Sequence, residues 1–227
     1  MAKVFTLNGV ASSTYNSFLK VAQNLLLNDQ IIAIPTDTIY GLAVNANCQR
    51  AIQRLYSVKK RDNHKPFAIC VADIDEIFTY GEVNVPSDLL RELLPGAVTV
   101  LFRRSQSVNA CLNPNHELVG IRIPDYPFVR DLCRISGPIA LTSANITNES
   151  SCLNVKEFQQ LWPSVDAIFD GGQLGHIDPQ RLGSTIIDLS NQGYFKIQRS
   201  GCVLEQTLKV LYKYGLKHVP LPNIDSN

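Results

Sequence analysis

Hydrophobic residues in several stretches of the chain recur with the spacing of an amphipathic helix. Across residues 13–27, Phe18, Val21, Ala22 and Leu25 follow the i, i+3, i+4, i+7 pattern, which predicts a helix with one buried face. Further helices are predicted at 51–58, at 73–80 with Asp73 as its cap, at 87–94 with Ser87 as its cap, at 127–135 and at 204–214.

Short apolar runs bounded by proline, glycine or polar residues predict β-strands. The run from Ile31 to Ile34 stops at Pro35, which is typical of a buried strand. The runs 185–189 and 194–197 flank an Asn-Gln-Gly turn, so we expect them to form a hairpin. Other strands are predicted at 67–71, 98–102, 119–123, 139–141 and 167–169.

These strands and helices mix without the regular alternation of a doubly wound sheet. We therefore predict one α/β domain built around a twisted, mixed sheet, over residues 13–215. Residues 1–12 are expected to be an N-terminal lead-in and residues 216–227 a loose C-terminal tail. A chain of 227 residues, 45% hydrophobic and 18% charged, has the composition of a globular protein with a substantial core.

Charge and cysteine content narrow the class of protein. The formal net charge of +1 gives no overall attraction for nucleic acid or anionic membrane, so any basic site must be local. No apolar run approaches the roughly 18 residues of a membrane span. The 6 cysteines and 4 histidines are scattered without metal-ligand spacing, so no zinc or iron–sulfur site is predicted.

The N-terminal segment indicates the cellular compartment in which the protein is expected. It lacks the features of a secretory signal, so a cytoplasmic protein with reduced cysteines is expected. An additional mitochondrial pool stays open, because no acidic residue precedes Asp29 and hydroxyl residues cluster nearby.

A concentrated positive segment follows the second predicted helix. Lys59, Lys60, Arg61 and Lys65 face a single acid, Asp62. One interpretation is a solvated turn, since cations favour a helix C-terminus. The other is a polyphosphate clamp in which Arg61 holds two oxygens and the lysines act as point charges.

Polar residues also stand where apolar strands end. Two threonines and an aspartate at 36–38 can bind a small zwitterion or form a turn bonded to its own backbone. After the strand at 139–141, Ser143 and Asn145 offer a hydroxyl and an amide to a nucleotide, or serve as a helix cap or Asx turn. Nothing marks Ser143 as a nucleophile, because no G-x-S-x-G surrounds it.

Arg122 stands alone inside an apolar strand. A buried, unpaired guanidinium is costly, so Arg122 should meet a carboxylate supplied by the protein or by a ligand. The chain has neither a P-loop nor a G-x-G-x-x-G fingerprint, so an ATP site here would be of an unrelated kind.

Taken together, these motifs resemble the YrdC-type threonylcarbamoyl-adenylate synthase family across residues 13–201, in its short, single-domain form. Each motif is weak alone, but chance does not place so many in order. The matching segments are Pro-Thr-Asp-Thr-Ile-Tyr-Gly-Leu at 35–42, Lys-Lys-Arg at 59–61 with Lys-Pro at 65–66, Leu-Pro-Gly at 94–96 with Thr99, Gly-Ile-Arg-Ile-Pro at 120–124, Ser-Ala-Asn at 143–145, Ser-Thr-Ile-Ile-Asp at 184–188 and Arg-Ser-Gly at 199–201.

The resemblance implies a fold, a reaction and a set of partners. The fold would be a twisted, open mixed β-sheet with flanking helices enclosing a basic concave cavity. The expected activity is nucleotidyl transfer, which forms threonylcarbamoyl-AMP and pyrophosphate from L-threonine, bicarbonate and ATP, with Mg²⁺ on the phosphates. The product would pass to a threonylcarbamoyl-transferase complex acting on tRNA, with no membrane partner and weak or absent direct tRNA binding.

The resemblance also implies roles for individual residues. Threonine would contact Thr38, Arg122, Thr142 and Ser184. The nucleotide would contact Arg61, Lys65, the backbone of Ala144, Ser151 and Arg199. The polyphosphate and catalytic groups would be Lys59, Arg61, Ser143 and Asn145.

Three positions depart from the family pattern. Cys70 replaces a histidine, Leu118 replaces a threonine or serine, and Ser-Cys-Leu at 151–153 replaces Ser-Pro-Thr. An alternative function is a non-catalytic RNA-binding module using the same basic cavity. The near-zero net charge and the lack of an RNA motif with stacking aromatics argue against that alternative.

Overall fold

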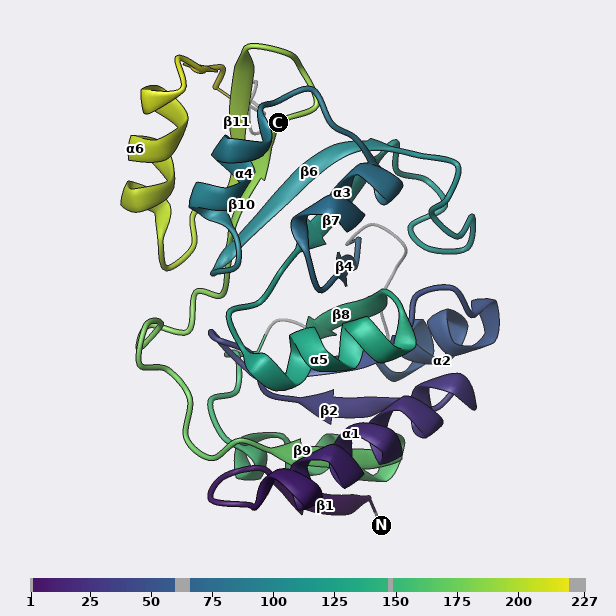
Figure 1. The fold of residues 1–227 in the computed structure, drawn as a ribbon. Coiled ribbons are helices and arrows are strands. Elements are labelled where there is room, and N and C mark those ends of the chain that lie inside the picture. The colour runs from purple at the N-terminus through teal and green to yellow at the C-terminus, as the bar shows by residue number, and fades with distance from the viewer. Residues whose placement is uncertain (1, 60–65, 147–148, 221–227) are drawn as a thin grey trace, which may run out of the picture.

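A long, twisted β-sheet runs through the molecule, with helices packed against it (Figure 1). The computed structural model describes residues 2–59, 66–146 and 149–220. The strands lie in the order β1-β9-β2-β3-β8-β4-β7-β6-β10-β11-β12, and β5 pairs with β6 off this path. Some neighbours run parallel, such as β1 with β9, and others antiparallel, such as β3 with β8. The predicted fold class is therefore confirmed.

The bounds of the elements are as follows. The strands are β1 (Lys3–Thr6), β2 (Ile32–Ile34), β3 (Gly41–Asn45), β4 (Ala68–Cys70), β5 (Gly81–Glu82), β6 (Val98–Arg104), β7 (Leu118–Arg122), β8 (Ile139–Ser143), β9 (Ala167–Asp170), β10 (Thr185–Asp188), β11 (Tyr194–Arg199) and β12 (Lys217–His218). The helices are α1 (Ser12–Leu27), α2 (Gln49–Lys59), α3 (Ile74–Tyr80), α4 (Ser87–Leu93), α5 (Pro127–Ser136), α6 (Leu204–Lys213) and the 3₁₀ helix η1 (Val155–Ser164).

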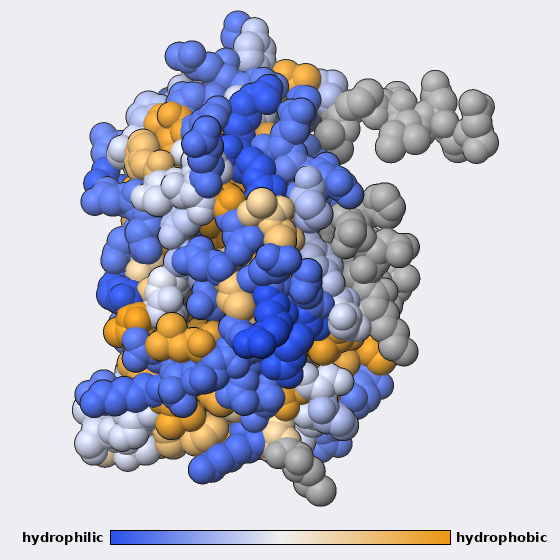
Figure 2. Space-filling model, turned by 90° about the vertical axis from the view of Figure 1, so that its right-hand side faces the viewer, coloured by the Kyte–Doolittle hydropathy of each residue, from blue (hydrophilic) through white to orange (hydrophobic). Residues whose placement is uncertain are grey.

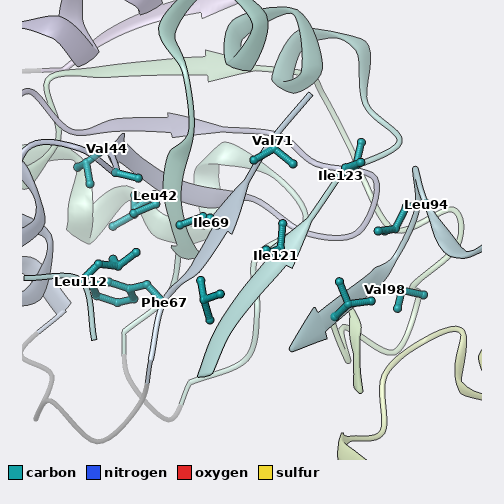
Figure 3. Close-up of a cluster of buried hydrophobic side chains, with 14 of the residues drawn as sticks. Leu42, Val44, Phe67, Ile69, Val71, Leu94, Val98, Leu112, Ile121 and Ile123 are labelled. Carbon is teal, nitrogen blue, oxygen red and sulfur yellow. The ribbon is translucent and has the colours of Figure 1, made fainter. Parts of the chain in front are cut away.

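The core consists of two hydrophobic clusters that share the central strands. In β2, Ile32 and Ile34 belong to one cluster and Ala33 to the other, because successive side chains of a strand point to opposite faces. Helices α1 and α5 cover the first cluster with Leu26 and Leu132, among others. Figure 3 shows part of the second, including Leu42, Val44, Phe67, Ile69, Val71, Leu94, Val98, Leu112, Ile121 and Ile123.

Several helix ends follow the local sequence. The predicted cap Asp73 forms a capping box with Glu76 at the start of α3, which supplies partners for otherwise unsatisfied backbone N–H groups. Gly137, with φ of 78°, ends α5 in a conformation that favours glycine. One capping prediction was wrong: Ser87 is the first residue of α4 and the cap is Pro86.

Some elements carry no clear signal in the sequence. Strand β1 lies within the predicted lead-in and is mostly exposed, yet it pairs in parallel with β9 along its whole length. Strand β3 begins at Gly41, shortly after the polar segment 36–38, where no strand was predicted. Strand β12, in the predicted tail, pairs with β11 over Tyr194–Lys217 and Phe195–His218. Long-range pairing, rather than local pattern, defines all three.

The surface is mainly polar. Figure 2 shows a largely hydrophilic face on which hydrophobic residues gather in separate small groups, as is normal for a folded domain. Within the described ranges, no helix is long and apolar enough to cross a membrane.

Candidate active site

A cavity of about 130 Å³ lies across the middle strands of the sheet. Its wall is made by strand ends and by the connection between β2 and β3, so the long sheet brings together residues that are far apart in the sequence. Polar and apolar residues share the lining, and its described members include two arginines and no carboxylate. The polar lining residues are Thr36, Thr99, Arg122, Thr142, Ser143, Ser184 and Arg199.

Arg122, at the end of β7, is paired inside the protein. Its Nη2 donates to Asp37 Oδ1 over 2.6 Å and to Thr38 Oγ1 over 3.1 Å, and its Nε donates to the Gly96 carbonyl over 3.3 Å. The side chains of Arg122 and Asp37 are only 7% and 5% exposed. The prediction that Arg122 meets a carboxylate is confirmed, and the carboxylate is Asp37. None of the described contacts uses Nη1, so a ligand carboxylate would bind there.

The segment 36–38 forms a turn that holds this pair in place. Thr36 Oγ1 accepts the backbone N–H groups of Thr38 and Ile39 over 3.1 and 3.2 Å, and donates to the Ile39 carbonyl over 2.7 Å. Thr36, rather than Asp37 or Thr38, therefore makes the side-chain bonds of the turn. Thr38 is left to contact Arg122 with its hydroxyl.

On the far side of the cavity, Ser184 is fixed by side chains from two strands. Arg199 donates to the Ser184 carbonyl from Nε and Nη2 over 3.1 and 2.8 Å, and from Nη2 to Ser184 Oγ over 3.1 Å. Thr99 Oγ1 lies 2.8 Å from Ser184 Oγ. A Cβ at Gly201 would lie 2.3 Å from the Ser184 carbonyl carbon, so only glycine permits this approach.

At the end of β8, Lys59 reaches the backbone of the Ser-Ala-Asn motif. The Lys59 ammonium, almost fully buried, donates to the Ser143 carbonyl over 2.8 Å and also to the Asn145 carbonyl. Asn145 Nδ2 donates to the carbonyls of Ile146 and Glu149, whereas its Oδ1, the atom that a cap or an Asx turn would use as acceptor, has no hydrogen-bond partner among the described atoms. The Ala144 N–H donates to the Tyr40 carbonyl over 2.9 Å. Of this motif, Ser143 lines the cavity.

Of the remaining predicted nucleotide contacts, the structure describes Ser151 only. Arg61 and Lys65 lie outside the described residues. Ser151 is half-buried, and its carbonyl accepts a hydrogen bond from Arg181 Nη1 over 2.9 Å. The next residue, Cys152, accepts the Tyr40 N–H over 2.9 Å and so joins this segment to the cavity wall.

Of two positions that depart from the family pattern, Cys70 and Leu118, one lines the cavity and the other does not. Cys70 is fully buried and lines the cavity. Burial raises the pKa of its thiol to about 12, although the nearby Arg122 guanidinium acts in the opposite direction, so the thiol is protonated near neutral pH. Leu118, at the start of β7, pairs with Arg103 and does not line the cavity.

The structure thus brings one group of predicted residues together. Arg122, Thr142 and Ser184 line a single cavity, and Thr38 contacts Arg122 directly. The sequence left the segment 36–38 a choice between ligand binding and a turn, and the family resemblance assigned a role there to Thr38 alone. Thr36, Asp37 and Thr99 received no individual role, although all three stand inside matched motifs. Across the described part of the chain, no group of three or more His, Cys, Asp or Glu side chains could hold a metal ion.

A twisted mixed sheet with a polar, arginine-containing cavity at its strand ends defines an α/β domain that binds a small anionic or zwitterionic ligand. The Sua5/YciO/YrdC family model, described as "Telomere recombination", matches residues 24–201. The chain belongs to this family.

Relatives of the chain agree with that assignment. The threonylcarbamoyl-AMP synthase of Bos taurus is 49% identical over 201 residues, which cover 87% of this chain and 73% of that protein. Among solved structures, Pyrococcus abyssi Sua5 complexed with L-threonine superimposes with a TM-score of 0.81 at 23% identity, covering 96% of this chain and 62% of that one. Escherichia coli YciO gives a TM-score of 0.77 at 23% identity, covering 88% and 96%. Both structures share this fold.

Proposed function

We propose that this chain is a threonylcarbamoyl-AMP synthase. It would convert L-threonine, bicarbonate or carbon dioxide, and ATP into threonylcarbamoyl-AMP and pyrophosphate, for threonylcarbamoyl modification of adenosine in tRNA. The observation that carries the proposal is the buried Arg122–Asp37–Thr38 group facing Ser184 and Arg199 across one cavity. Relatives up to 49% identical are named for this activity.

The cavity offers complementary groups for threonine. Arg122 would bind the carboxylate through Nη1, because Asp37 and Thr38 already hold Nη2 in place. The hydroxyls of Thr142 and Ser184 would hydrogen-bond the rest of the amino acid. A competing free amino acid without a polar side chain, such as alanine, would leave these buried hydroxyls unpaired, so the cavity would bind it less well than threonine.

The reaction itself needs positioning and charge neutralisation. The threonine amine is carboxylated, a carbamate oxygen then attacks the α-phosphate of ATP, and pyrophosphate leaves. Arg199, which lines the cavity, and Lys59, which bonds the backbone of Ser143 beside it, are proposed to neutralise phosphate charge. Arg61 and Lys65 are proposed to complete the polyphosphate site. The protonated Cys70 thiol is no nucleophile for this reaction.

Magnesium is proposed to arrive bound to ATP. Within the described residues, no group of three or more His, Cys, Asp or Glu side chains could hold the ion, and the ATP phosphates are proposed to carry it. When bound, Mg²⁺ would neutralise phosphate charge.

The alternative function, an RNA-binding module, finds less support. The cavity is small and polar, and the aromatic side chain in its lining, Tyr40, is fully buried and makes hydrogen bonds with its hydroxyl, so it offers no platform for a stacked base. A module of this kind would bind tRNA with a strong dependence on salt.

Pyrophosphate release tests the proposal. Purified protein is incubated with Mg²⁺–ATP and with threonine and bicarbonate, together and singly. Pyrophosphate should form only when both co-substrates are present, and Arg122→Ala should raise the KM for threonine. Tight tRNA binding without pyrophosphate release would favour the alternative instead.

A further inference from the structure

A single long connection crosses the site. Residues 171–183, hereafter the strap, join β9 to β10, although β2, β3, β8, β4, β7 and β6 lie between these strands in the sheet. In Figure 1 the strap runs along the left edge of the molecule, between the lower and upper parts of the sheet. It ends at Ser184, one of the cavity residues.

Arg181 joins the strap to the segment that contains Ser151. Its Nη1 donates to the Ser151 carbonyl over 2.9 Å and to Glu157 Oε2, and its Nη2 donates to Glu157 Oε1 over 3.1 Å. Glu157 Oε2 also accepts the Leu153 N–H over 3.0 Å, and Oε1 accepts Asn154 Nδ2 over 2.8 Å. One ion pair therefore holds residues 151, 153 and 154 together.

The backbone of Arg181 adopts a conformation that is unfavourable for a residue other than glycine. Its φ is +61°, in the left-handed region that non-glycine residues rarely adopt. The guanidinium is held on two edges, by a carboxylate and by a carbonyl, which is the geometry that a planar guanidinium satisfies and an ammonium does not. Its hydrogen bond with Glu157 lowers the pKa of that carboxyl, so the pair is fully charged near neutral pH.

The strap residues on either side of Arg181 are anchored independently of its side chain. Asp178, fully buried, accepts the N–H groups of Leu182 and Gly183 over 2.8 and 2.6 Å. The Gly183 carbonyl accepts the Cys202 N–H over 3.1 Å, and Arg199 holds Ser184. Loss of the Arg181 side chain would therefore free the Ser151 carbonyl and leave the Glu157 carboxylate without its cation. Leu153 would keep its bond from the Leu174 N–H, and Ser184 would stay in place.

We propose that Arg181 is a positioning residue for the nucleotide, acting through Glu157 and the Ser151 carbonyl. It fixes the Ser151 end of the segment 151–154, which Tyr40 joins to the cavity wall through Cys152. The inference rests on the proposed function, because it assigns ATP to this side of the cavity. Threonine would be held by Arg122 and Thr38, and by Ser184, whose position is fixed by Thr99 and Arg199 independently of the Arg181 side chain.

The test separates the two substrates. Wild type, Arg181→Ala, Arg181→Lys, Glu157→Gln and the Arg181→Ala/Glu157→Gln double variant are compared by KM for ATP at saturating threonine and by KM for threonine at saturating ATP. Each single variant should raise the KM for ATP by about tenfold and leave the KM for threonine within about twofold. The double variant should be no worse than Arg181→Ala, because both changes break one interaction.

Controls keep the outcomes distinct. The control variant Arg134→Ala removes a comparably exposed arginine from α5. Arg134 pairs with Asp131 on the same helix and with Asp73 at the start of α3, so its loss should leave both KM values unchanged. Equal increases in both KM values, or no increase in the KM for ATP in the folded Arg181→Lys protein, would overturn the positioning role. Direct binding of ATP, measured by calorimetry, gives the same comparison without turnover. If wild type binds ATP but forms no adenylate, the proposed function fails while the role of Arg181 is still decided.

Discussion

At the scale of single residues, the buried Arg122–Asp37 pair best links stability to function. Both side chains are almost inaccessible to solvent, and the second Asp37 oxygen, Oδ2, has no hydrogen-bond partner among the described atoms. Such a pair contributes little to stability compared with apolar residues of the same size, but removing one partner leaves an uncompensated buried charge. We therefore interpret the pair as a device that fixes one edge of the guanidinium and leaves the other for a ligand.

This interpretation predicts the outcome of substitutions at both positions. Arg122→Ala and Asp37→Ala should each lower the free energy of unfolding by about 3–5 kcal/mol, as expected for breaking a buried ion pair. The Asp37→Leu/Arg122→Met double variant should regain much of that stability without regaining threonine turnover. Urea unfolding and steady-state kinetics measure the two effects. A double variant as active as wild type would show that the pair has no role in binding.

Cys70 gives a second prediction at this scale. Because burial raises its pKa to about 12, the thiolate that could act as a nucleophile is almost absent at pH 7–9. Cys70→Ala should keep kcat within a few-fold of wild type, and the wild-type thiol should resist alkylation at pH 8 while the protein is folded. Complete loss of turnover in a folded Cys70→Ala protein would contradict the noncovalent mechanism.

A third prediction at the residue scale concerns Gly201. A Cβ there would collide with the backbone of Ser184 and Thr185 at 2.3 Å, and backbone cannot move aside as a flexible side chain can. Gly201→Ala should therefore cost about 1–3 kcal/mol of stability through overpacking and should raise the KM for threonine by displacing Ser184. The neighbouring, exposed Ser200→Ala is the matched control. Wild-type kinetics in Gly201→Ala would mean that Ser184 is not held from this side.

At the scale of secondary-structure elements, the start of α3 combines a cap with surface charge. Asp73 caps the helix and forms ion pairs with Arg130 and Arg134 on α5. The hydrogen bond from Arg134 is the main reason that the pKa of Asp73 lies below its ordinary value of 3.8. The carboxylate therefore stabilises the folded state above about pH 4, and this stabilisation is lost as the pH falls through the lower pKa of the folded protein.

Asp73→Asn isolates this charge, because asparagine is also a good N-cap. Wild type should be more stable than Asp73→Asn at pH 6–7, and the difference should shrink as the pH falls below about 4. Unfolding free energies measured across this pH range test the claim, with the exposed Asp125→Asn as a control for loss of a carboxylate. A difference that is constant with pH would show that the ion pairs contribute nothing.

Most elements could be predicted from the sequence, and the exceptions share a physical cause. Helix α1 and strand β2 follow from local periodicity, because a single buried face or a short apolar run determines them. Strand β1 has one buried residue and exists because its backbone pairs with β9, more than 160 positions away in the chain. Such pairing leaves no local pattern to read.

The candidate site also contains features that the sequence could predict and features that it could not. Arg122 could be predicted to need a carboxylate from its apolar surroundings, but the choice of Asp37 depends on the turn that Thr36 builds. The family resemblance indicated the cavity residues. The role of Arg181 required the strap, whose course across the sheet no spacing in the sequence predicts.

At the scale of the whole molecule, the long sheet explains how one cavity collects residues from most of the chain. Strands β3, β4, β7, β8 and β11, which all contribute to its wall, come from positions spread between residues 41 and 199. Arg199 and the edge of Arg122 that Asp37 does not hold both belong to the cavity, which suits it to carboxylate and phosphate groups, while the molecule as a whole stays nearly neutral. We therefore expect the affinity for substrate to arise within the cavity and the non-specific attraction for RNA to be weak.

The most direct test of this account follows the carbon of bicarbonate. Purified protein is incubated with ¹⁴C-bicarbonate, threonine and Mg²⁺–ATP, and the label in nucleotide products is measured beside pyrophosphate. The account predicts one labelled product that contains adenylate and threonine, formed in a 1:1 ratio with pyrophosphate and absent when any one substrate is omitted. Pyrophosphate released without label in an adenylate, or at the same rate without threonine, would contradict it.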